Sequence, residues 1–128
     1  LDPRERIRFR NLLVELSKNR IVIFSTHIIE DVASSCNKVA VMKKGEVQYL
    51  GAPIKMAKIA EDKVWMFTIS ANEFEKQKDK YAIIHHMKDG DFIRCRCLSI
   101  EAPTPEAKKV KANLEDAYLY LLTKESKG

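Results

Sequence analysis

The chain has 128 residues, of which 45% are hydrophobic and 32% are charged, and its formal net charge is +5. This length supports one hydrophobic core, or a core fragment joined to a small appended unit, and excludes two full domains. The composition excludes collagen-like and disordered chains. No apolar run approaches the roughly 20 residues that span a bilayer, and no signal-peptide pattern opens the chain, so a membrane anchor is not expected.

The cysteine count indicates the compartment of the protein, whereas its net charge indicates little about its partners. The three cysteines are an odd number without the spacing of a disulfide framework, which favours a reducing, cytosolic compartment. Lysine and arginine are spread along the whole chain, so the positive charge alone is a weak indication of a polyanionic partner or a membrane surface.

The first half of the sequence predicts an α-β-α-β order. Asp2 is placed to cap a helix that begins at Pro3 and ends near Asn19. The apolar run at residues 21–24 has the pattern of a strand that is buried on both faces, as in a parallel sheet. Ser25 and Thr26 are placed to cap a second helix. A second buried strand is predicted at residues 39–42.

A hairpin follows, and after it the order of the predicted elements changes. Lys43-Lys44-Gly45 predicts a turn into a strand at residues 46–50, followed by a short helix at 54–60. Residues 64–122 predict β-α-β-β-α. The predicted elements are a strand at 64–70, a helix at 72–80, strands at 82–88 and 91–100 joined by Asp89-Gly90, and a last helix capped by Asn113.

His27 is the main candidate for a functional residue. It follows Ser25 and Thr26 at the carboxyl end of the predicted strand, where open α/β sheets bind ligands. A plainer interpretation is that these residues only begin the next helix, and that Asp2 is only a helix cap. Taken separately, neither residue decides between the two interpretations.

The motifs in their order resemble the end of the ATPase domain of ABC transporters, in particular the ABC-2-like subfamily. The motifs that carry the resemblance are Leu1-Asp2-Pro3, matching the D-loop; Ser25-Thr26-His27, matching the switch histidine; and Ile29-Glu30-Asp31 in the helix that follows. The resemblance covers residues 1–60 well. The tail from Leu114 to Leu119 resembles the Leu-Glu-Asp segment that closes that subfamily's extension, whereas residues 62–112 match only in general pattern.

This resemblance implies a role for each matching residue. His27 would contact the γ-phosphate of ATP and the attacking water, so it is both the catalytic and the cofactor-binding candidate. Leu1 and Asp2 would lie in the D-loop at the interface of an ATPase homodimer. The implied cofactors are ATP and Mg²⁺ in the complete subunit, and the implied partner is a transmembrane permease. The implied location is the cytoplasmic side of the cell membrane, bound peripherally.

The departures from the family pattern are large. The sequence has no phosphate loop with its lysine, no Walker B aspartate, no general-base glutamate and no signature motif. We therefore expect this fragment to be inactive alone, with no ATP or Mg²⁺ bound. We also expect that it was cut just after the catalytic carboxylate segment. An unpaired strand at residues 21–24 would then cause self-association or altered packing of the first half.

The predicted fold class is α/β, or α+β overall. Residues 1–61 would form the end of a truncated ABC ATPase domain, and residues 62–128 a β-α-β-β-α accessory extension. No metal site is predicted, because Cys95 and Cys97 lack a second ligand pair and are better explained by packing. Two alternatives stay open: a free-standing regulatory or nucleic-acid-binding module with a coincidental Ser-Thr-His, although no nucleic acid is expected, and an enzyme with an independent active site.

Overall fold

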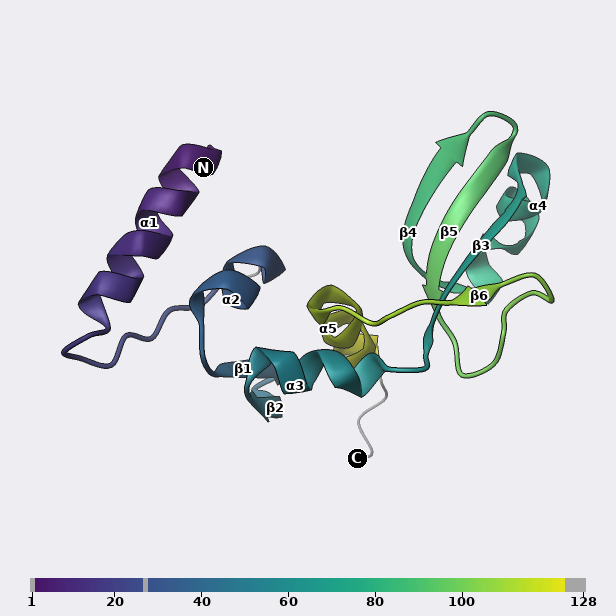
Figure 1. The fold of residues 1–128 in the computed structure, drawn as a ribbon. Coiled ribbons are helices and arrows are strands. Elements are labelled where there is room, and N and C mark those ends of the chain that lie inside the picture. Colours follow the sequence, from purple (N-terminus) through teal and green to yellow (C-terminus); the bar gives the residue numbers. More distant parts are fainter. Residues whose placement is uncertain (1, 27, 124–128) are drawn as a thin grey trace. The chain divides into compact units, whose positions relative to one another are not determined.

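The computed structural model describes residues 2–26 and 28–123. The chain divides into two compact units, Leu1–Pro53 and Ile54–Gly128 (Figure 1). Both units contain helices and strands, so the predicted mixed α/β class is confirmed. The division between the units lies earlier along the chain than the boundary predicted after Glu61, and the assignment of domains 1–61 and 62–128 stays a prediction.

The first helix begins where the sequence predicts. Helix α1 (Pro3–Leu16) is capped by Asp2, whose carboxylate accepts a hydrogen bond from the backbone N–H of Glu5 at 3.0 Å. It ends before the predicted stop at Asn19. Ser17 donates its hydroxyl proton to the carbonyl of Val14 at 2.7 Å, and such local side-chain bonds compete with the helical ladder.

The strand predicted at residues 21–24 is not present. These residues, all described, form no strand, and Ile21 and Ile23 are 89% and 88% exposed. The run has the β-branched, apolar composition of a buried strand, but such a strand is stable only when neighbours pair with its backbone and cover its faces. Among the described residues no strand pairs with this run, and only Val22 and Phe24 are half-buried. The prediction of a formed strand is therefore wrong for this structure.

The second helix also starts later than predicted. Helix α2 (Ile29–Ser35) has Ile28 at its cap position, with no side-chain cap. The hydroxyl of Thr26 instead accepts a hydrogen bond from the backbone N–H of Ile28 at 3.0 Å, forming a local turn of the kind that Ser and Thr favour. The prediction that Ser25 or Thr26 caps this helix is wrong, although the helix itself is confirmed.

The predicted hairpin of the first unit is present. Strands β1 (Val39–Lys43) and β2 (Glu46–Gly51) pair antiparallel, with a register shift between Val41 and Met42. Lys44 and Gly45 connect them with φ angles of 51° and 79°. Positive φ at both central residues is the pattern of a type I′ turn, whose twist matches that of the strands.

Two short helical segments begin the second unit. Helix α3 (Pro53–Ala57) continues into a 3₁₀ turn, η1 (Lys58–Ala60). Met56 and Ala60 are buried, whereas Ile54 is exposed. This agrees with the short helix predicted at residues 54–60.

The second unit contains a four-stranded sheet in the order β4-β5-β3-β6. Its strands are β3 (Val64–Ser70), β4 (Ala82–Asp89), β5 (Phe92–Leu98) and β6 (Lys108–Lys109), all antiparallel to their neighbours. β4 and β5 pair up to Asp89 and Phe92, so Gly90-Asp91 forms the turn, one residue later than predicted. Gly90 has φ of 63°, and a glycine at the first turn position is typical of type II′.

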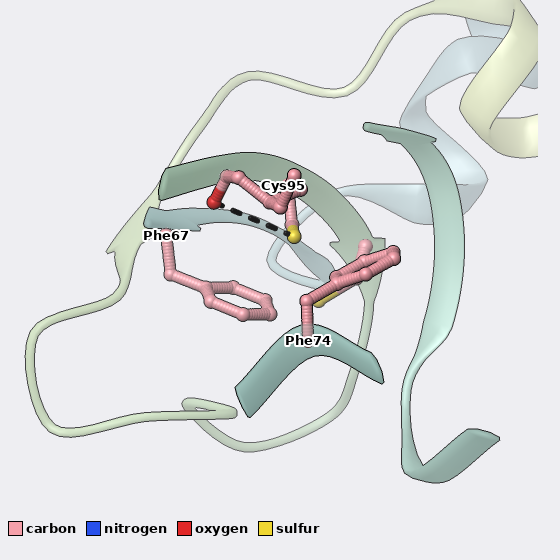
Figure 2. Close-up of a cluster of buried hydrophobic side chains, with 5 residues drawn as sticks. Phe67, Phe74 and Cys95 are labelled. Carbon is pink, nitrogen blue, oxygen red and sulfur yellow. Dashed lines mark hydrogen bonds between the residues drawn. The ribbon is translucent and has the colours of Figure 1, made fainter. Parts of the chain in front are cut away.

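One face of this sheet is covered by helix α4 (Ala71–Gln77) and contains the core shown in Figure 2. Phe67 of β3, Phe74 of α4 and the alternate residues of β5 that face them, Ile93, Cys95 and Cys97, are buried together. This alternation places Arg94 and Arg96 on the opposite face. A short 3₁₀ turn, η2 (Lys78–Lys80), connects α4 to β4.

The last helix, α5 (Leu114–Thr123), begins after the predicted cap. The side-chain oxygen of Asn113 accepts a hydrogen bond from the backbone N–H of Asp116 at 2.9 Å, and the Asp116 carboxylate accepts one from the N–H of Asn113 at 2.8 Å. This reciprocal pair is a capping box. The helix packs against η1 (Figure 1).

Candidate functional site

Of the three predicted site residues, only Asp2 lies among the described residues. His27 and Leu1 lie outside them, so the roles expected of these two residues stay predictions. Asp2 is exposed and its carboxylate caps α1. Its position at the start of α1 fits the plainer interpretation, and this structural role is compatible with a place in a D-loop.

The described residues of the first unit line a hollow of about 690 Å³. It is lined by the end of α1, residues 20–24, the segment that follows α2, and Leu50 of β2. Arg20 and Lys38 are the charged residues of this lining, and no carboxylate belongs to it. The lining thus lacks the carboxylates that usually bind Mg²⁺ in proteins, and most of its side chains are apolar.

The first unit exposes much of its apolar surface. None of the residues of α1 is buried, and Ile7, Phe9, Leu12 and Val14 are each about half exposed. Among the described residues of this unit, Val41 is the one buried hydrophobic side chain. Exposed apolar surface on this scale is typical of interaction surfaces, which contact other proteins, membranes or ligands.

The described glycines do not form a phosphate loop. Gly45 and Gly90 lie in hairpin turns, and Gly51 ends strand β2. A phosphate loop instead needs glycines between a strand and the N-terminus of a helix, where backbone N–H groups point at the phosphates. The described residues therefore do not fit a complete ATP site. In addition, no group of three or more His, Cys, Asp or Glu side chains among them could hold a metal ion.

Cys95 and Cys97 are packing residues in the structure. Both thiols are unexposed, and that of Cys95 donates a weak hydrogen bond to the carbonyl of Ile93 at 3.9 Å (Figure 2). Burial raises the pKa of the Cys95 thiol. Burial, together with the charge of Cys95, raises the pKa of Cys97 to about 11 from an ordinary 9.0. Protonated, enclosed thiols are poor metal ligands and poor nucleophiles.

The raised pKa of Cys97 predicts a loss of stability at high pH. The unfolded chain loses this proton first, so the stabilisation is complete below pH 9 and is lost as the pH rises through 11. The expected loss from this thiol is about 2 to 3 kcal/mol. Urea unfolding at pH 8 and pH 11 measures it, with Cys97→Ala as the control for other titrating groups. An equal pH dependence in both proteins would contradict this prediction.

A charged cluster on the opposite face of the sheet was not predicted. Asp116 of α5 is 0% exposed and accepts hydrogen bonds from Arg96 of β5, from Nε at 3.0 Å and from Nη2 at 2.5 Å. Arg96 Nη2 also donates to the carbonyl of Lys111 at 3.1 Å. Hydrogen bonding to Asp116 raises the pKa of Arg96, so this guanidinium stays charged. His85 of β4 pairs with Glu115 nearby.

One sequence signal could have located half of this cluster. Asn113 and Asp116 are three residues apart, which is the spacing of a capping box, and Asp116 belongs to the segment that resembles the closing Leu-Glu-Asp. The partner Arg96 lies 20 residues away. No local pattern selects it from the other basic residues of the chain.

Known proteins with a similar sequence support the resemblance. The chain is 34% identical over 73 residues to the uncharacterised ABC transporter ATP-binding protein YxlF of Bacillus subtilis (strain 168), covering 57% of this chain and 24% of that protein. It is 38% identical over 53 residues to ABC transporter A family member 11 of Dictyostelium discoideum, covering 41% and 6%. For member 4 of that family the identity is 43% over 42 residues, covering 33% and 3%.

These matches confirm the resemblance to ABC transporter ATP-binding proteins. The aligned part spans about a quarter of the length of the Bacillus relative and much less of the other two. No family model matches the chain, and no solved structure is significantly similar to it. In the described part of the chain, no helix has the length and apolar character needed to cross a bilayer.

Proposed function

From its similarity to ABC transporter ATP-binding proteins, we propose that this chain is part of the ATP-binding subunit of an ABC transporter. In such a subunit ATP hydrolysis drives movement of a substrate across a membrane. The observation that carries the proposal is this similarity, together with the order Leu1-Asp2-Pro3 and Ser25-Thr26-His27 in the sequence. Residues 1–61 would be the end of the ATPase domain, and residues 62–128 an accessory extension.

The uncovered surface of the first unit supports this proposal. Helix α1 has no buried residue, and the apolar run at 21–24 forms no strand. Both features are expected if the rest of an ATPase core normally covers these residues. We propose that strands of that core pair with residues 21–24. This would complete the strand that the sequence predicts and would place His27 at its carboxyl end.

His27 is proposed as the catalytic residue of the complete subunit. A histidine after Ser25 and Thr26 can donate a hydrogen bond to a phosphate oxygen or hold the attacking water. Asp2 and Leu1 would lie at the interface of two ATPase subunits. The complete subunit would take ATP and Mg²⁺, form a homodimer, and bind a transmembrane permease at the cytoplasmic face of the membrane.

The chain itself is expected to lack activity, because the groups that hold the phosphates and the metal are missing from its sequence. Backbone amides and a lysine provide most of the affinity for nucleotide phosphates. We therefore expect no ATP turnover above background, and a dissociation constant of about 1 mM or weaker. Isothermal titration with Mg-ATP and a phosphate-release assay measure both. Micromolar binding would indicate an independent site and would contradict the proposal.

A further inference from the structure

Helix α5 is held by two separate sets of contacts in the second unit. At its N-terminal turn, Asp116 is joined to Arg96 of the sheet. Along its body, Ala117 and Leu121 are buried, and the helix packs against η1. The helix therefore bridges two parts of the chain that are far apart in sequence, the middle of β5 and the segment that precedes β3.

The contact at the sheet is a closed set of hydrogen bonds. The Asp116 carboxylate accepts two from Arg96 and one from the backbone of Asn113. Arg96 in turn binds the carbonyl of Lys111, in the segment that leads into α5. Asp116 is fully buried, so opening this contact would leave a charge without partners in a low-dielectric site. A partly opened contact, in which Asp116 stays buried without a partner, is therefore unfavourable.

The contact at η1 is apolar and has one further anchor. Ala60 of η1 is 0% exposed, as is Ala117 of α5. Lys63, between η1 and β3, places its Nζ 5.3 Å from the ring centre of Tyr120, within the range of a cation–π contact. Residues 58–63 thus contact the same helix that Arg96 fixes to the sheet.

We propose that α5 and the connection at residues 54–63 open and close as one cooperative unit. We call α5 the brace of this unit and the Arg96–Asp116 pair its clasp. This connection follows directly after the first unit. If the proposed function holds, this connection contains the end of the ATPase portion and the start of the extension. The cooperative unit itself is a property of the second unit and does not depend on ATP.

Hydrogen exchange on the whole chain, read by mass spectrometry, tests the brace. Leu121→Ala removes buried apolar side-chain atoms from the body of α5, and Arg96→Met opens the clasp. Each variant is expected to raise exchange by at least about tenfold at both ends, in residues 58–60 and in 114–122, because a cooperative unit opens as a whole. Amides of β3 and β5 that pair with each other should keep their protection.

Glu115→Gln is the matched control, since Glu115 precedes Asp116 but forms an exposed pair with His85. We expect wild-type exchange in this variant. The brace is refuted if each substitution affects only its own side, or if exchange rises equally throughout the sheet. Should Arg96→Met fail to fold, Leu121→Ala decides the question alone, because it leaves the clasp intact and must still raise exchange in the first turn of α5.

Discussion

Replacement of His27 by alanine is expected to lower ATP hydrolysis by about 100-fold or more in the complete subunit, since general acid–base groups contribute on this scale. The physical reason is the loss of the side chain that would hold the attacking water and the γ-phosphate. Binding of Mg-ATP should change much less, because phosphate affinity comes from backbone amides and a lysine elsewhere. Single-turnover phosphate release measures the effect, and equilibrium titration measures the binding.

The matched control for this substitution is His86→Ala. His86 lies in β4, where its ring contacts that of Phe74 at a centroid distance of 5.0 Å. It has no predicted contact with nucleotide, so hydrolysis should stay within about twofold of wild type. Equal losses in the two variants, or full activity of His27→Ala, would remove His27 from the reaction.

Replacement of Asp116 by asparagine is expected to lower the free energy of unfolding by about 3 to 5 kcal/mol, as is typical when one partner of a buried ion pair is removed. The carboxylate accepts three hydrogen bonds, and Arg96, only 17% exposed at its side chain, would lose its counter-charge. Urea unfolding of the chain, followed by circular dichroism, measures the loss. The control Glu115→Gln should change stability by less than about 1 kcal/mol, because that pair is exposed.

The double variant Arg96→Met, Asp116→Leu separates the ion pair from simple packing. Removing both charges leaves no buried charge alone, so the double variant should be more stable than Asp116→Asn. Part of the loss should remain, because the backbone N–H of Asn113 also loses its acceptor, the carboxylate half of the capping box. A double variant less stable than Asp116→Asn would show that the pair is not the origin of the effect.

Elements with local signals could be predicted from the sequence. Asp2 before Pro3 predicts the start of α1, Lys44-Gly45 predicts a tight turn, and Asn113 predicts the start of α5. Each of these depends on residues within three or four positions along the chain. The strand at residues 64–70 was also predicted with its observed bounds, because alternate residues Trp65, Phe67 and Ile69 give one apolar face.

Features that depend on distant residues could not be predicted. The apolar run at 21–24 has the composition of a strand, but composition cannot supply the neighbouring strands that such a run needs, and in the structure this run forms no strand. The partner of Asp116 is likewise decided by the register of β3, β4 and β5, which brings Arg96 under α5. Pairing across a sheet is a property of the fold and has no local signature.

For the candidate site, the sequence motifs name three residues, and the structure describes one of them. Motif order alone points to His27, Leu1 and Asp2, and only Asp2 lies among the described residues. Its role as a helix cap is confirmed, whereas its place in a D-loop stays a prediction. The resemblance to ABC transporter ATP-binding proteins, by contrast, is confirmed by the sequence comparisons.

The central claim is that this chain works as part of an ABC ATPase, and the reading frame that leads to the codon of Leu1 tests it most directly. We expect sequencing of that DNA to show, in frame, a phosphate loop with its lysine, a signature motif and a strand that ends in Asp-Glu. A start codon next to Leu1 without these motifs would contradict the claim and would favour a free-standing regulatory or nucleic-acid-binding module.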